Sequence, residues 1–160
     1  MSGGTETVRY YVSAGYSNIE GAARGSDSEK LSTLAKVDVE YNKYVSFTAK
    51  IDYTTTSNSG YSSVVNPFDY AYSTTRTMPA YNEDGSYYMS YRAAGATNRD
   101  YIGYNVLKEL DNTGKSSKMD DFNALLALRL NLWGGLKYEG TFSWHTGNTS
   151  TRDWATAQSY

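Results

Sequence analysis

The chain has 160 residues, of which 39% are hydrophobic, a formal net charge of −2 and a mean hydropathy of −0.62. No apolar run approaches the roughly 20 residues that a membrane-spanning helix needs, so a helical span is excluded. A near-neutral charge without a long basic stretch also argues against nucleic acid as a partner.

The residue types favour β-structure. The chain has 17 Tyr and 14 Gly, which are typical of strands and turns, and no Cys, which removes disulfides and thiolate chemistry. A membrane β-barrel remains possible because its strands place an apolar residue only at every second position, and averaged hydropathy hides them. The first residues lack the basic start and apolar core of a signal peptide, so an outer-membrane protein would need a segment upstream.

Five segments alternate with a period of two and are predicted to be strands near residues 7–19, 31–42, 44–56, 118–133 and 136–149. In each segment one set of alternate positions is free of charge. These sets are Val8 to Tyr16, Thr33 to Tyr41, Val45 to Tyr53, Phe122 to Leu132 and Leu136 to Trp144. The intervening positions carry the charges, so the sequence predicts an antiparallel sheet with one apolar face. A soluble β-sandwich would show the same alternation.

Two features favour a barrel over a sandwich. Aromatic residues stand towards the ends of the apolar sets, as in an interfacial girdle: Tyr10, Tyr16, Tyr41, Tyr53, Tyr138 and Trp144. The connections are also unequal, with tight turns at Asn42-Lys43 and Gly134-Gly135, a medium loop at residues 21–29 and a long loop at residues 55–119. Both tight turns fall at one end of the predicted sheet, as periplasmic turns do in barrels.

The long loop has local structure of its own. Residues 78–89 predict a hairpin around Asp84-Gly85, and the spacing of Val106, Leu107 and Leu110 predicts a short helix over residues 104–111. The loop is rich in aromatic residues that could stack on a sugar or grip a peptide. The candidate ligand or lid contacts are Tyr61, Phe68, Tyr70, Tyr81, Tyr87, Tyr88 and Tyr91. The alternative is that these rings pack the loop's own small core.

Catalytic and metal-binding patterns do not emerge. His145 has no Cys or HExxH partner, and the segment from Asp111 to Gly114 places Phe122 where a calcium loop needs its bidentate Glu. Asp120-Asp121 and Glu83-Asp84 are adjacent pairs and not the opposed carboxylates of a glycosidase. We therefore expect no enzyme activity and no metal or cofactor.

Several stretches resemble a known family. They are Ser2 to Glu6 leading into Arg9 to Tyr16; Asn66 to Tyr70 with Arg76 to Ser86; Glu109 to Thr113; and Gly135 to Gly140 with Arg152 to Trp154. Together they are similar to the barrel of SusC/RagA-type TonB-linked (TonB-dependent) outer-membrane transporters. The resemblance covers nearly the whole chain.

The resemblance implies an all-β fold: about five strands of an antiparallel, 22-stranded transmembrane β-barrel, with residues 55–119 as a long extracellular loop. Residues 1–160 would then be a partial TonB-dependent receptor barrel domain, without the plug and the remaining strands. It also implies the outer membrane of a Gram-negative cell, with outer-membrane lipid around the barrel. The implied partners are the TonB complex, reached through the absent N-terminal parts, a SusD-like surface lipoprotein acting as a lid, and an imported oligosaccharide or peptide.

Two functions are carried forward. In the first, the chain is a transporter segment whose charged face lines the lumen through Arg9, Lys36, Asp38, Lys50, Asp52 and Arg129. The alternative for those charges is that they pair with one another. In the second, the chain is a soluble β-rich carbohydrate-binding module, which requires a second sheet over the apolar face.

Overall fold

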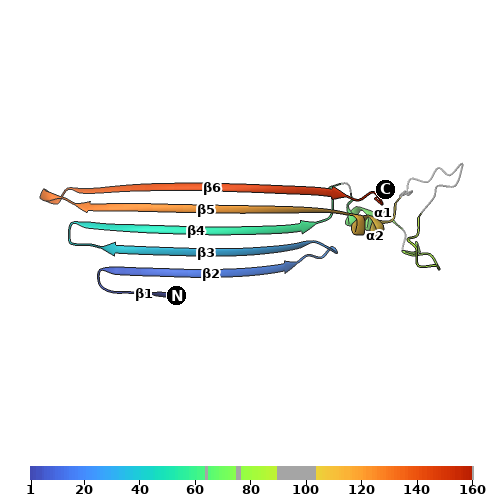
Figure 1. Ribbon diagram of the computed structural model, residues 1–160, viewed down its shortest axis with the longest axis horizontal. Coiled ribbons are helices and arrows are strands. Elements are labelled where there is room, and N and C mark those ends of the chain that lie inside the picture. Colours follow the sequence, from blue (N-terminus) through green and yellow to red (C-terminus); the bar gives the residue numbers. More distant parts are fainter. Residues whose placement is uncertain (64, 75–76, 90–103, 160) are drawn as a thin grey trace. The chain divides into compact units, whose positions relative to one another are not determined.

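The structure is a computed structural model that describes residues 1–63, 65–74, 77–89 and 104–159. Its strands form one antiparallel six-stranded sheet in chain order, β1-β2-β3-β4-β5-β6 (Figure 1). The strands are β1 Ser2–Gly4, β2 Val8–Glu20, β3 Asp27–Glu40, β4 Val45–Gly60, β5 Thr113–Asn131 and β6 Lys137–Ala155. The predicted antiparallel sheet with sequential pairing is confirmed.

The strands depart from the predicted bounds in several places. β3 begins at Asp27, inside the loop predicted at residues 21–29, and β6 continues to Ala155. β1 was not predicted, because Ser2–Gly4 offers no apolar alternation, yet it pairs with β2 in the register Ser2↔Tyr11 and Gly4↔Arg9. β4 continues to Gly60 and β5 begins at Thr113, so both strands extend into the region expected to be loop. These extensions are rich in Ser, Thr and Gly, and backbone pairing with neighbouring strands forms them without an apolar pattern.

The tight turns have clear local causes. Between β3 and β4 the side chain of Asn42 accepts the N–H groups of Tyr44 at 2.8 Å and of Val45 at 2.9 Å, which is an Asx turn. Between β5 and β6 a short 3-10 turn, η1 (Trp133–Gly135), contains glycines with φ of 66° and 82°, a backbone conformation that favours glycine. Together with the turn before β2, all three tight connections fall at one end of the sheet.

Two helices lie within the long β4–β5 connection, α1 (Pro67–Ser73) and α2 (Val106–Asn112). The helix expected at residues 104–111 is therefore confirmed as α2. α1 was not predicted, although Asn66 caps it by accepting from Phe68 N and Asp69 N, and Pro67 occupies its first turn. The predicted hairpin is confirmed by the Tyr81↔Tyr87 bridge and by Gly85, whose φ is 82°.

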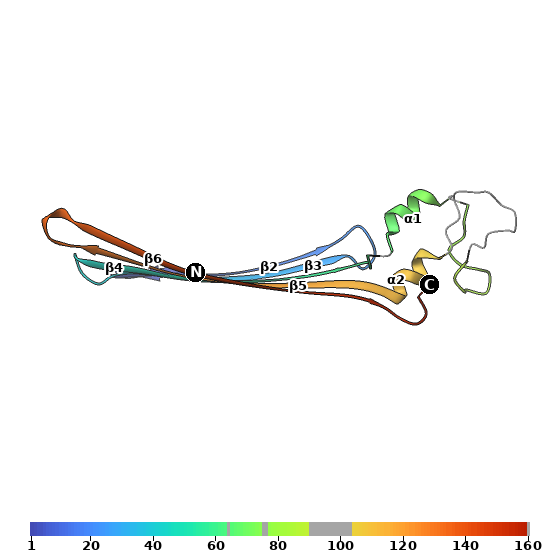
Figure 2. The ribbon, with the colours of Figure 1, turned by 90° about the horizontal axis from the view of Figure 1, so that it is seen from above.

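The chain divides into two compact units. The sheet unit comprises Met1–Ile19, Ser28–Ser57 and Lys118–Ser150, and the loop unit comprises Glu20–Asp27, Asn58–Ser117 and Thr151–Tyr160. Seen from above, β2 to β6 form a single layer (Figure 2). Among the described residues the only buried hydrophobic side chain is Val65, in the loop unit, so the sheet unit has no covered apolar core.

Neither helix in the described part of the chain combines the length and apolar character needed to cross a membrane.

Candidate functional site

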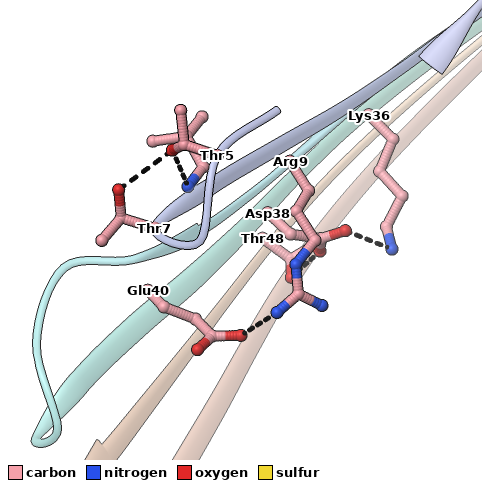
Figure 3. A network of polar contacts seen from close by, with 8 residues as sticks. Thr5, Thr7, Arg9, Lys36, Asp38, Glu40 and Thr48 are labelled. Atoms are coloured by element: carbon pink, nitrogen blue, oxygen red, sulfur yellow. Dashed lines mark hydrogen bonds and ion pairs between the residues drawn. The ribbon is translucent and has the colours of Figure 1, made fainter. Parts of the chain in front are cut away.

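One face of the sheet carries a row of paired polar side chains that starts on β2 and β3 (Figure 3). Arg9 Nη2 lies 2.9 Å from Glu40 Oε1 across the two strands. Lys36 Nζ lies 2.8 Å from Asp38 Oδ2, and Asp38 also accepts a hydrogen bond from Thr48 Oγ1 on β4 at 2.6 Å. Contact between these side chains places the charged positions of three strands on one face.

The row continues to the last strand. Asp52 on β4 lies 3.1 Å from Lys50 Nζ and accepts from Asn123 Nδ2 on β5 at 2.7 Å. His145 Nδ1 on β6 lies 2.6 Å from Asn123 Oδ1 and must be the donor, since an amide oxygen only accepts. Arg129 and Glu139 pair across β5 and β6, with a distance of 2.7 Å from Nε to Oε1.

All six residues predicted to face the lumen therefore lie in this paired row. They are Arg9, Lys36, Asp38, Lys50, Asp52 and Arg129. Each one pairs with an oppositely charged residue, as the alternative interpretation expected, and the lumen itself stays a prediction. His145, which has no metal-binding partner in the sequence, belongs to this row through its hydrogen bond to Asn123. No cluster of three or more metal-binding side chains occurs among the described residues.

The opposite face is apolar and exposed. Its aliphatic and aromatic side chains keep large exposed fractions, for example 47% for Val12, 56% for Leu126 and 65% for Phe142. Phe122 and Trp144 pack edge to face with ring centroids 5.8 Å apart. Beyond Phe122 this face becomes polar, because Tyr53 Oη donates to Asp120 Oδ1 at 2.9 Å. A broad apolar surface thus ends at a tyrosine with a polar partner.

The loop aromatics mostly pack on one another. Tyr61 and Phe68 are 6.5 Å apart and edge to face. Tyr81 and Tyr87 lie 5.5 Å apart across the hairpin. These contacts match the alternative that the rings form the loop's own core.

The remaining loop aromatics differ in exposure. Tyr70 packs against Tyr104 at 5.5 Å, and burial raises the pKa of both phenols. Tyr88 is half-buried, while Phe68 keeps 57% of its surface exposed. Tyr91, the last predicted contact, lies outside the described residues.

Asn105 holds the loop unit together and was not identified from the sequence. Its Oδ1 accepts from Leu107 N at 2.9 Å and Lys108 N at 3.3 Å, which caps α2. Its Nδ2 donates to Ala80 O at 2.8 Å and Tyr88 O at 2.9 Å, which fastens the hairpin to the helix. The sequence did contain a signal for the helix cap, because an Asn stands directly before the apolar pair Val106-Leu107. It contained no signal for the hydrogen bonds from Asn105 to the hairpin.

Asp111 joins three segments of the same unit. It accepts a short hydrogen bond from Tyr87 Oη in the hairpin, and its Oδ1 lies 3.2 Å from Arg24 Nη2 in the β2–β3 connection. The hydrogen bond to this carboxylate raises the pKa of the Tyr87 phenol. Arg24 is thereby fixed in position while its side chain remains 65% exposed.

The chain matches no protein-family model and no curated protein significantly. The function of the chain is therefore inferred from the geometry of the two faces and of the loop unit.

Proposed function

We propose that this chain is a segment of the β-barrel of a TonB-dependent outer-membrane transporter of the SusC/RagA type. Such a transporter would import glycans or peptides together with a SusD-like lipoprotein. The observation that carries the proposal is a single antiparallel sheet whose apolar face is exposed while its other face carries a row of paired charges.

The apolar face supports a lipid environment. Exposed apolar patches on soluble monomers rarely exceed a few hundred Å², and this face bears large exposed side chains on every strand from β2 to β6. In a bilayer, lipid chains would cover such a surface and keep its apolar side chains out of contact with water. The second sheet that a soluble sandwich needs does not occur in the described part of the chain.

Strand length and connections agree with a barrel segment. β2 to β6 have 13 to 19 residues, more than the roughly 9–11 that cross a bilayer, so each strand can extend beyond the membrane. The tight connections are at one end of the sheet, and the longer ones, including the helices and the hairpin, are at the other. This is the arrangement of short periplasmic turns and longer extracellular loops.

The two edges of the sheet support a larger assembly. β6 is an edge strand of 19 residues with unpaired backbone groups on its outer side, and in lipid such groups must be satisfied by a neighbouring strand. Further strands of the same barrel would pair with β6 and extend the sheet beyond β1.

The test uses single cysteines, because the chain has none of its own. In cells producing the complete transporter, we expect a membrane-impermeant maleimide to label Glu83→Cys, in the hairpin, without treatment. Lys43→Cys, in the β3–β4 turn, should react only after the outer membrane is permeabilised, and Leu126→Cys only after denaturation. Equal labelling of all three variants in denaturant is the control.

Two results would contradict the proposal. Equal labelling of Glu83→Cys and Lys43→Cys in intact cells would mean that the two ends of the sheet are not on opposite sides of a membrane. Rapid labelling of Leu126→Cys without denaturant would mean that water reaches the apolar face, and would favour the soluble carbohydrate-binding module.

A further inference from the structure

One carboxylate on the charged face differs from the carboxylates of the paired row. Those of the row each lie beside a cation, and they belong to Asp38, Glu40, Asp52 and Glu139. Asp121 stands two residues before Asn123 on β5 and therefore lies on the same face. It is half-buried, and within the part of the chain that the structure describes no hydrogen bond or ion pair engages its carboxylate.

Gly147 on β6 leaves an open space beside this carboxylate. A Cβ placed on Gly147 would lie 2.9 Å from Asp121 Oδ1 and 3.6 Å from His145 Nε2, so these two atoms are at most 6.5 Å apart. Both atoms border the space that the missing side chain leaves. All three residues belong to the sheet unit, and all three lie on its charged face.

The Nε2 atom of His145 is a hydrogen-bond acceptor in the neutral ring. The Nδ1 atom donates to Asn123 Oδ1 at 2.6 Å, so the proton of the neutral imidazole is on Nδ1 and Nε2 keeps its lone pair. Asn123 is fixed in turn, because its Nδ2 donates to Asp52 at 2.7 Å. Two acceptors, the imidazole Nε2 and the Asp121 carboxylate, therefore face the same space.

A group that binds both acceptors must donate at least two hydrogen bonds. A single hydroxyl donates only one, whereas an ammonium donates three and supplies a positive charge for Asp121. Two acceptors that are each about 2.9 Å from a tetrahedral nitrogen lie roughly 4.7 Å apart, which is within the limit set at Gly147. An ammonium is also compact, whereas a guanidinium is a planar fork that matches the two oxygens of one carboxylate.

Met119 supplies an apolar surface next to the two acceptors. It stands two residues before Asp121 on β5, so it lies on the same face, and its side chain is 41% exposed. A lysine side chain has a four-carbon apolar stem and a charged tip, and such stems lie along apolar surface. The thioether beside two acceptors matches these two parts of a lysine.

We propose that Asp121, His145 and Met119 bind the side chain of a lysine in an imported peptide. The ammonium would donate to Asp121 Oδ1 and His145 Nε2 over Gly147, and the stem would lie on Met119. The inference rests on the proposed function, because it assigns lysine-containing peptides as a substrate class of the transporter and the charged face as the surface that binds them.

The test is a binding titration with the complete transporter in detergent micelles. The probes are acetyl-Ala-Lys-Ala-amide, the same peptide with norleucine for lysine, which keeps the stem without the ammonium, and a chitosan trimer, whose ammonium groups are on sugar rings. We expect the lysine peptide to bind at least about tenfold more tightly than the norleucine peptide, since charge-assisted hydrogen bonds are the stronger ones. Asp121→Asn should reduce the affinity for the lysine peptide to about that of the norleucine peptide.

A second variant blocks the space without changing any charge. Gly147 is not among the glycines with positive φ, so alanine is compatible with its backbone. The added methyl group would stand 2.9 Å from Asp121 Oδ1, and Gly147→Ala should therefore also weaken binding of the lysine peptide. Glu139→Gln is the matched control, because it makes the same carboxylate-to-amide change on the same face at a residue that is already paired with Arg129. It should leave all affinities unchanged.

Three results would overturn the inference. The first is equal affinity for the lysine and norleucine peptides. The second is an affinity for the lysine peptide that stays the same in Asp121→Asn and Gly147→Ala, or that falls equally in Glu139→Gln. The third is a chitosan trimer that binds as tightly as the lysine peptide and is weakened by the same two variants, which would assign the site to amino sugars.

The two proposals fail separately. A protein that shows the expected cysteine labelling but does not prefer the lysine peptide refutes the lysine site alone. A protein that binds the lysine peptide as expected but labels as a soluble chain refutes the transporter and leaves the lysine site standing.

Discussion

Replacing Leu128 by arginine tests the proposal that the apolar face of the sheet contacts lipid. Leu128 is on the apolar face of β5, in the run from Phe122 to Leu132, and its side chain is 40% exposed. At about 3.4 Å per residue this run is roughly 34 Å long. A strand tilt of about 35–45° reduces its height to about 24–28 Å, which matches an apolar band of about 25 Å. In the proposed barrel Leu128 would then lie near mid-bilayer.

An arginine at this depth costs about 2–4 kcal/mol, or roughly a 30- to 700-fold loss in the folding equilibrium. The matched control is Arg129→Gln on the adjacent, opposite-facing position. It removes the ion pair to Glu139, in which both side chains are 61% exposed, and an exposed pair contributes about 0–1 kcal/mol. Leu128→Arg should therefore assemble much less well.

The assay is the yield of folded, membrane-integrated transporter for each variant, measured by gel migration with and without heating. Equal yields of Leu128→Arg and Arg129→Gln would show that the faces are assigned the wrong way round. Val12→Arg on β2 should behave like Leu128→Arg, because Val12 is also on the apolar face and 47% exposed.

Three further predictions concern the loop unit. Asn105→Ala should destabilise it by about 2–3 kcal/mol, because the helix cap is lost and the carbonyl oxygens of Ala80 and Tyr88 each lose a hydrogen bond. Asn105→Asp keeps the capping oxygen but turns a carboxylate oxygen toward those two carbonyl oxygens in a buried site, so it should destabilise the loop unit at least as much. Hydrogen-exchange protection of the hairpin that survives in Asn105→Asp would contradict this. Because the hydrogen bond to Asp111 raises the pKa of Tyr87, the stabilisation from this contact is fully present below about pH 10 and is lost as the pH rises through the raised pKa. Hydrogen-exchange protection of the hairpin should therefore decrease as tyrosinate absorbance increases, and Tyr87→Phe should abolish this pH dependence. Replacing residues 61–104 by a short Gly-Ser bridge should leave barrel assembly intact and reduce uptake or association with the lid protein. If uptake and lid association both stay at the level of the parent protein, the loop is dispensable for this function.

The sequence determined the two faces of the sheet. A period of two places alternate residues on one side of a strand whatever its neighbours are, so the charged and apolar sets could be assigned from each strand alone. The contacts from Arg9 to Glu40 and from Arg129 to Glu139 join residues of the charged set only. The hairpin at Asp84-Gly85 was equally predictable, because a turn depends on few adjacent residues.

Structure without such local signals could not be predicted. β1 and the first residues of β5 lack alternation, and they are strands because neighbouring backbones pair with them. The link from Asn105 to Ala80 and Tyr88 depends on how the hairpin packs against α2. No pattern of residues at a fixed spacing in the sequence predicts these contacts.

The tertiary structure also decided how the aromatic residues pack. The aromatic residues singled out in the sequence turned out largely to pack on one another, whereas Trp154, which was not singled out as a ligand contact, packs over Gly114 of the neighbouring strand. Residue composition identifies rings that could bind a ligand. Which rings pack against other residues depends on how distant segments meet, as at Gly114, whose missing side chain leaves room for the indole of Trp154.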